Sequence, residues 1–454
     1  MKKYSWLIWL LSVAAILVSV PALVLLGPWD ERLADASDLQ AKPVAINPAD
    51  NAFPGLEKTG KLVVDKQINL DGYDQSLLCH FCNTDAWDPD LAKEMLATNR
   101  QVFPLLEANL ACKHYARPSI TDFSTPVPWQ SKMDALDNLL FIQSKLAQME
   151  GDYAAATKAG LLEFRLGQLR VDDANCLPDW MRGRRYQVAA LTRLEELVAD
   201  AKAPETSLRH ILQTLSQWNS EAMRNRGFTQ AIQNQFANYV QSLADLKQGK
   251  TTLEKVVGED NTRLKNPWLT ELCIRSSYTF RPNASINLMA RFHRELIADA
   301  KKPFTKRTTW PTWMNAFDRV FTLRSPLQPN YIGKLVYTST CRLYSFPVEI
   351  EKLETWVSAL RLKTALRLYE LQHGKLPESL EALKPEFLQE VPMDPFAEKP
   401  FRYSKERRIV WASCPDRKEN NGKADKGQIM YYSHGCDLVM PIGTREPAII
   451  PPAK

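Results

Sequence analysis

The sequence predicts a mostly α-helical protein with an N-terminal transmembrane helix, an irregular helical extracytoplasmic domain and a small α+β C-terminal domain. No charged residue occurs from Tyr4 to Trp29, which is typical of a membrane-spanning helix. Apolar residues then recur at helical spacing between about residues 76 and 340, and no sustained alternation of apolar and polar residues appears before residue 400. After residue 400, short apolar runs separated by charged turns predict strands.

The uncharged segment predicts a single membrane anchor, which occupies residues 1–29 together with a short cytoplasmic tip. As a helix it satisfies its backbone polar groups internally, which the hydrocarbon core of a bilayer requires. Lys2 and Lys3 precede the segment and Asp30 and Glu31 follow it, which favours a cytoplasmic N-terminus. We therefore expect a single-pass protein of the bacterial cytoplasmic (inner) membrane that contacts lipid through this helix and exports the rest of the chain. A cleaved signal peptide is the alternative, but the apolar run exceeds the usual h-region of about 7–15 residues.

The composition is that of an ordinary globular protein. Hydrophobic residues make up 45% and charged residues 24% of the 454 residues, so disorder is not expected. A net charge of +6 is mild for this length. It suits solubility near an anionic membrane but does not indicate a nucleic-acid partner, and export argues further against one.

The exported chain divides into three parts. Residues 30–75 scatter Asp, Pro, Gly and Lys without a helical or strand period, which predicts a linker. Residues 76–340 form the predicted helical domain, and residues 341–454 form the predicted α+β domain. The clearest helical feature is a helix pair over residues 131–169 with a turn at Glu150-Gly151-Asp152. This pair resembles a tetratricopeptide hairpin, although no second copy follows at the period of about 34 residues that a repeat array requires.

The C-terminal domain begins with a helix and continues with short strands. Leu353, Trp356, Leu360 and Leu368 share one helical face, and Gly374 can end the helix because glycine tolerates positive φ. Two strands are predicted at 401–404 and 409–413. A loop rich in Asp, Asn, Lys and Gly then leads to apolar residues at 429–432 and 437–441.

Motifs of this domain resemble the major pseudopilin of type II secretion over about residues 355–440. They are His373-Gly374-Lys375-Leu376-Pro377, then Val391-Pro392-Met393-Asp394-Pro395-Phe396, then Tyr403. The resemblance implies a helix, a short helix and a small antiparallel sheet. The N-terminus lacks the peptidase motif of a pseudopilin, so the resemblance implies a borrowed fold and not a filament subunit. The whole layout also resembles uncharacterised single-pass envelope proteins of planctomycete and verrucomicrobial type.

The pseudopilin resemblance also implies a calcium site in the C-terminal loop. Calcium prefers six to eight oxygen ligands, and several side chains of the loop carry them. The candidates are Asp416, Asn421, Asp425 and Asp437. Arg417, Lys418, Lys423 and Lys426 interrupt these acids, so a solvated turn without calcium is the alternative.

Eight cysteines in an exported chain permit disulfides, and two pairs stand out. Cys414 and Cys436 flank the C-terminal loop, where a disulfide would stabilise a region poor in apolar residues. Cys79-His80-Phe81-Cys82 has the spacing of a structural disulfide or of a redox pair. With Cys112 and His114 it could instead complete a Cys₃His zinc site, and buried thiols are a further alternative.

We therefore expect a membrane-anchored extracytoplasmic scaffold or interaction protein, with envelope or secretion-machinery proteins as candidate partners. No histidine, serine or glycine motif of a known catalytic type is present in the sequence. The alternative is an extracytoplasmic thiol oxidoreductase or metal-dependent enzyme that uses Cys79 and Cys82. A helical ligand-binding receptor is a third class, because helical cavities leave no sequence motif.

Overall fold

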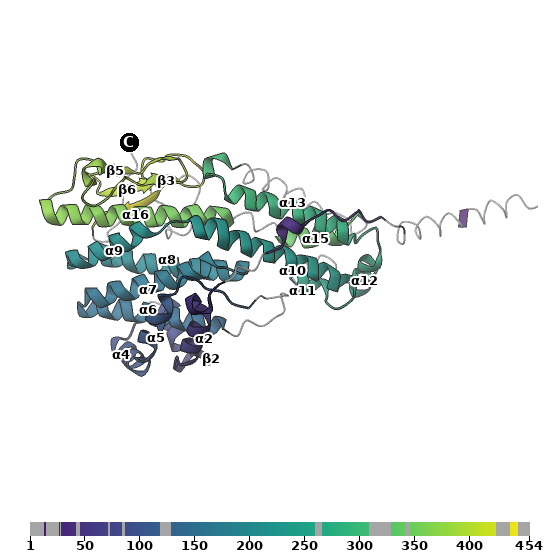
Figure 1. Ribbon diagram of the computed structural model, residues 1–454, viewed down its shortest axis with the longest axis horizontal. Coiled ribbons are helices and arrows are strands. Elements are labelled where there is room, and N and C mark those ends of the chain that lie inside the picture. The colour runs from purple at the N-terminus through teal and green to yellow at the C-terminus, as the bar shows by residue number, and fades with distance from the viewer. Residues whose placement is uncertain are drawn as a thin grey trace, which may run out of the picture.

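Helices make up most of the protein, and its three described sheets are small and antiparallel. The structure is a computed structural model, and Figure 1 shows its helices stacked in layers beneath one small sheet. It describes residues 13–14, 27, 29–41, 46–70, 73–83, 87–118, 129–258, 266–307, 328–340, 346–423 and 436–443.

The helical body contains the following helices and one hairpin. Its N-terminal part comprises η2 (Ser37–Leu39), η3 (Pro48–Asp50), α2 (Ala52–Lys61), the antiparallel strands β1 (Gln67–Leu70) and β2 (Tyr73–Ser76), α3 (Leu77–Asn83), α4 (Pro89–Thr98) and α5 (Val102–Leu110). Its centre comprises α6 (Gln130–Glu150), α7 (Tyr153–Asp172), α8 (Leu177–Ala199), α9 (Glu205–Gln217), the π-helical turn η4 (Met223–Phe228) and α10 (Thr229–Lys247). It ends with α11 (Leu253–Val257), α12 (Pro267–Arg275), α13 (Pro282–Ala300), η6 (Phe304–Lys306) and α15 (Tyr331–Thr340).

The predicted helix pair is confirmed as α6 and α7, and α8 packs closely against it. Gly151 ends α6 with a φ of 82°, and the Asp152 carboxylate accepts a hydrogen bond from the Ala155 N–H to cap α7. The backbones of α7 and α8 approach closely at Gly167 and Gly183. A Cβ on Gly167 would lie 2.6 Å from the Gly183 carbonyl oxygen, so this packing requires glycine.

The C-terminal module is built on α16 (Phe346–His373), followed by η8 (Leu380–Leu383) and five short strands. These strands are β3 (Met393–Asp394), β4 (Lys399–Pro400), β5 (Arg402–Ser404), β6 (Ile409–Ala412) and β7 (Leu438–Pro441). Strand β3 pairs with β4, and the three-stranded sheet has the order β5-β6-β7. In Figure 1, α16 lies between this sheet and the layer of α8 and α9, and side chains around most of its circumference are buried.

The motifs that led to the pseudopilin prediction make hydrogen bonds that connect parts of this module. The Tyr403 hydroxyl donates to the Pro377 carbonyl at 2.9 Å and so ties β5 to the Gly-x-x-Pro turn. The Asp394 carboxylate accepts from the N–H groups of Phe396 and Ser413, at 2.9 and 2.7 Å. Burial raises the pKa of Asp394, and these two donors oppose that rise. The motif residues therefore have structural partners within the module.

Two sequence predictions about organisation need correction. Residues 30–75 are not a structureless linker, because they contain η2, η3, α2 and the first strands, and Asn51 caps α2. The α+β module is not separated from the helical body, because one hydrophobic core runs from Leu39 through α8–α10 and α16 to Ile442. A second core lies among α2–α8.

The predicted membrane anchor and one predicted apolar run lie largely outside the described residues. Of the segment from Tyr4 to Trp29, only residues 13, 14, 27 and 29 are described. Among the helices of the described ranges, none combines the length and apolarity needed to cross a membrane. Residues 429–432 are also outside the described part.

We predict that Gly167→Ala destabilises the protein although alanine is the better helix former. A Cβ would overlap the α8 backbone, and overpacking of this kind costs about 1–3 kcal/mol of unfolding free energy. Gly160→Ala, on the same helix, is the matched control because the atoms nearest its Cβ would belong to side chains, with the flexible Leu194 nearest at 3.0 Å and Ser144 at 3.7 Å. Urea denaturation should separate the two variants, and equal unfolding free energies would contradict the proposed close contact.

Candidate functional site

The predicted Cys-x-x-Cys motif lies on α3 in surroundings that oppose thiolate chemistry. Cys79 is exposed and Cys82 is partly buried. Burial raises the pKa of the Cys82 thiol well above its usual value, and the carboxyl groups of Asp137 and Glu163 raise it further. A redox or nucleophilic cysteine needs the opposite shift. None of the seven described cysteines forms a disulfide with another described cysteine.

The alternative zinc set is not assembled by the described side chains. The Cys112 thiol donates to the Ala49 carbonyl at 3.8 Å, and Nδ1 of His114 lies 3.2 Å from the Asp173 carboxylate. Within the described ranges, no three His, Cys, Asp or Glu side chains are grouped so that they could hold a metal ion.

The C-terminal loop uses its predicted calcium ligands to fold its own backbone. Both carboxylate oxygens of Asp437 accept from the Asn420 N–H, at 3.1 and 3.0 Å, and one accepts from the Gly422 N–H at 2.7 Å. Asp416 accepts from the Lys418 N–H at 3.0 Å. Asn421 has a positive φ of 53°, and Asp425 lies outside the described residues. These contacts are those of an Asx-type turn, which needs no cation.

The cysteines that flank this loop are not joined. Cys414 is buried beside the sheet, while Cys436 is partly exposed, and neither is in a disulfide in the described structure. Burial raises the pKa of Cys414 to about 12, and the nearby Asp437 and Asp416 carboxyl groups contribute to the rise. The predicted pairing of Cys414 with Cys436 is therefore not formed.

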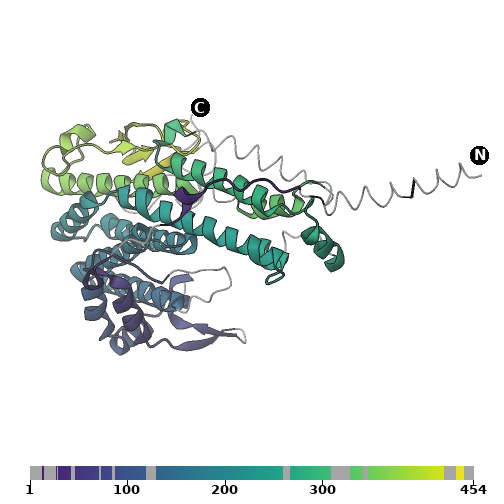
Figure 2. The same ribbon diagram turned by 45° about the vertical axis from the view of Figure 1, so that its right-hand side comes forward.

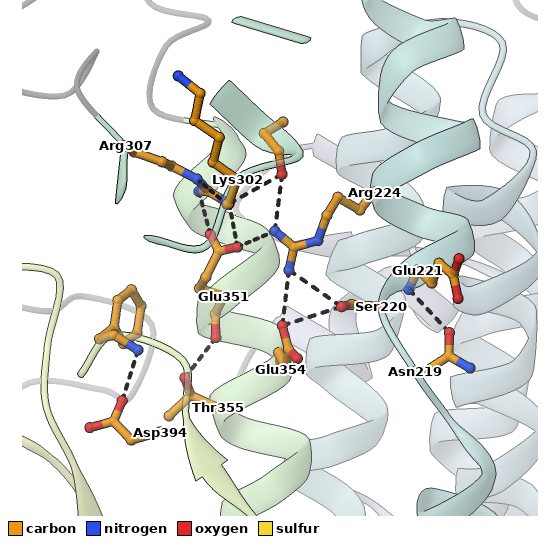
Figure 3. Close-up of polar contacts among 12 residues, drawn as sticks. Asn219, Ser220, Glu221, Arg224, Lys302, Arg307, Glu351, Glu354, Thr355 and Asp394 are labelled. Carbon is orange, nitrogen blue, oxygen red and sulfur yellow. Dashed lines mark hydrogen bonds and ion pairs between the residues drawn. The ribbon is translucent and has the colours of Figure 1, made fainter. Parts of the chain in front are cut away.

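The most prominent polar site is a junction cluster that the sequence did not reveal, formed by Ser220, Arg224, Arg307, Glu351 and Glu354 (Figure 3). Arg224 donates to Oε1 of Glu351 at 2.5 Å, and Arg307 donates to both of its carboxylate oxygens at 2.6 Å. The side chains of Arg307 and Glu351 are only 4% and 2% exposed. Each buried charge therefore depends on the others for stabilisation.

The junction cluster ties three parts of the chain together. Arg224 also donates to Glu354 at 3.0 Å, and the Ser220 hydroxyl donates to the same carboxylate at 3.2 Å. Both guanidinium groups donate to the Ala300 carbonyl at the end of α13, at 3.0 and 3.2 Å. Two cations and two carboxylates thus join η4, the end of α13 and α16.

A second buried ion pair joins α16 to α8. Nζ of Lys363 lies 3.3 Å from Oε1 of Glu195, and their side chains are 0% and 3% exposed. The other carboxylate oxygen of Glu195 has no hydrogen-bond partner among the described residues. Together with the junction cluster, this pair holds α16 against the body from Glu351 to Lys363.

A third polar network lies inside the body, at the centre of the α6–α8 layer. Asp179 accepts hydrogen bonds from Arg117 and Arg170, the latter at 2.8 Å. Arg170 also donates to the Tyr186 hydroxyl and to Gln130, each at 2.8 Å. The two arginine side chains are fully buried, so the network fixes the helices against one another.

Asp137 and Glu163 differ from these networks because their carboxyl groups are buried with incomplete pairing. Both carboxyl oxygens of Glu163, and Oδ1 of Asp137, have no hydrogen-bond partner among the described residues. Burial raises the pKa of Asp137 to about 8 and that of Glu163 well above its usual range. At neutral pH the pair therefore retains protons that exposed carboxyl groups would have lost.

Sequence reasoning missed the buried charges because their partners are distant along the chain. Glu351 lies 127 residues from Arg224 and 44 residues from Arg307. The local sequence carries little signal, because Glu351 has charged neighbours at Glu349, Lys352 and Glu354, as an exposed helix face would. Charges in such positions are either exposed or paired inside the protein.

We predict that Glu351→Gln strongly destabilises the protein. The substitution leaves two buried guanidinium groups without their shared anion, and breaking a buried pair costs about 3–5 kcal/mol of unfolding free energy. Glu205→Gln is the matched control, because Glu205 pairs with Arg209 on α9 with both side chains nearly half exposed. Such a pair contributes about 0.3–0.5 kcal/mol. Similar losses for the two variants in urea denaturation would contradict a structural role for the junction cluster.

We predict that Asp137→Asn flattens the pH dependence of stability. The unfolded carboxyl loses its proton near pH 4, whereas folded Asp137 keeps it until about pH 8. This contribution to stability is therefore complete below about pH 4 and is lost as the pH rises to about 8, at up to about 1.4 kcal/mol per pH unit. Denaturation between pH 4 and pH 9 should show a smaller decline for Asp137→Asn than for the wild type. Glu254→Gln, at an exposed position, is the control, and identical slopes for wild type and Asp137→Asn would refute the assignment.

Comparison of the chain with protein-family models, with curated proteins and with solved structures found no match. The resemblance of residues 355–440 to the major pseudopilin therefore stays a prediction. The proposal for its function therefore rests on the geometry of the chain itself, above all on the way the junction cluster attaches α16 to the helical body.

Proposed function

We propose that the protein is a membrane-anchored extracytoplasmic scaffold, linked to secretion or envelope assembly, that holds its C-terminal module in a fixed position for a partner protein. The observation that carries this proposal is the burial of α16. Its charged side chains pair with the body through Glu351 and Lys363, and its apolar side chains pack against α8, α9 and the sheet. A module mounted in this way is suited to presenting a surface at a fixed position.

The surface that remains for a partner consists of the sheet edges and loops of the module. Because α16 is covered, we exclude it from the proposed contact. Arg407 and Arg417 in the loops donate to backbone carbonyls and so brace the loop structure. Lys418 and Lys423 are exposed in the loop between β6 and β7. A partner that presents acidic side chains would complement these lysines.

We predict that the double variant Lys418→Glu, Lys423→Glu loses its partner in native membranes. Reversing two charges at a complementary contact should lower partner recovery about tenfold, which corresponds to about 1.4 kcal/mol. The measurement is photocrosslinking of the tagged full chain with a benzophenone amino acid at Glu419, followed by mass spectrometry. Substitution is preferable to deletion of the module, because deletion would remove α16 from the core.

The matched control is charge reversal at Lys93 and Lys158, which are exposed on α4 and α7. It should leave the crosslinked partner unchanged. Equal recovery from both double variants would contradict a contact at the C-terminal loop. Recovery of no protein other than the chain itself would argue against the scaffold function.

A further inference from the structure

The last residues of the uncharged N-terminal segment are held against the helical body by side-chain contacts. The Ser277 hydroxyl donates to the Gly27 carbonyl, and the Trp29 ring packs edge-on against Tyr278 at a centroid distance of 6.2 Å. Both partners lie in the turn between α12 and α13. The uncharged segment from Tyr4 to Trp29 therefore ends at this turn.

The residues that follow Trp29 lie along α13 and are hydrogen-bonded to it. The Asp30 carboxylate accepts from the N–H groups of Asn283 and Ala284, each at 3.0 Å, and so caps α13. Asn287 donates to the Arg32 carbonyl and accepts from the Ala34 N–H, at 2.9 and 2.8 Å. Figures 1 and 2 show this segment along α13, running toward the end of the molecule where α12 lies.

Helix α12 exposes a large aromatic side chain at the same end. Trp268 is 72% exposed, the highest value among the large hydrophobic side chains of the described residues. Trp29 is 38% exposed nearby in the fold. Two basic side chains belong to this region: Arg275 is exposed on α12, where it pairs with Glu271 at 2.6 Å, and Lys247 lies 5.6 Å from the centre of the Phe280 ring.

We propose that α12 lies in the headgroup layer of the membrane, with Trp268 at the boundary between headgroups and acyl chains. This inference rests on the proposed function, because it requires that residues 4–29 are the membrane anchor. Tryptophan favours this boundary because its ring is apolar and its N–H is polar. Lys247 supplies a positive charge for anionic headgroups, and the exposed Arg275–Glu271 ion pair adds no net charge against them. The body is then held against the bilayer at two places, the anchor and α12.

The test uses the full chain in nanodiscs of phosphatidylethanolamine and phosphatidylglycerol that contain a phospholipid with a diazirine near its headgroup. After illumination, mass spectrometry locates the lipid adducts. We expect adducts within residues 4–29 and within residues 266–275. Trp268→Ser should reduce the adducts at 266–275 several-fold and leave those at 4–29 unchanged. Trp268→Tyr, which keeps an amphipathic ring, should restore most of them.

Met149→Ser is the matched control, because Met149 is also a large exposed apolar residue, at 57%, but lies on α6. It should change neither set of adducts. Adducts at 4–29 with none at 266–275 would overturn the placement of α12 and leave the anchor intact. A lack of adducts at 4–29 would overturn the anchor, and with it the proposed function.

Discussion

The carboxylate of Glu351 is buried between the guanidinium groups of Arg224 and Arg307, and the position of the C-terminal module depends on this arrangement. Burying these charges is favourable only when each keeps its partners, because removing one leaves the others desolvated and unpaired. The requirement fixes α16 relative to η4 and the end of α13. The ion pair between Lys363 and Glu195 fixes a later turn of α16 against α8. The sheet then packs on a helix that cannot shift without breaking both contacts.

This arrangement gives the motifs on which the pseudopilin prediction rests a structural explanation within the chain itself. Gly374 ends α16 with a φ of 69°, Tyr403 reaches back to Pro377, and Asp394 holds the end of β6 through the Ser413 N–H. These contacts build a small sheet next to a helix. Here the body covers that helix, which is why the proposed partner surface lies on the loops.

Local features of the fold could be predicted from the sequence, whereas the buried polar sites could not. The α6–α7 hairpin was predictable because its apolar spacing and its turn at Gly151 are both short-range signals. The short helix α2 was missed because its signals are weak: a capping Asn51, a proline and two glycines in ten residues. The environment of Cys82 depends on Asp137 and Glu163, which come from other helices, so the motif alone could not show that its thiolate is disfavoured. The junction cluster depends on contacts across 44 and 127 residues, which a single sequence does not reveal.

Residues 30–38 are attached along α13, and this attachment limits how far the body can move away from residues 4–29. A flexible linker over residues 30–75 would let the body explore a radius of about 40 Å around its point of attachment. The contacts of Asp30, Asn287 and Arg294 remove that freedom from the first residues onward. For a chain anchored through residues 4–29, the C-terminal loop would then sample a narrow range of heights above the bilayer. A partner at a matching height would meet it at high effective concentration, and one at another height would not meet it at all.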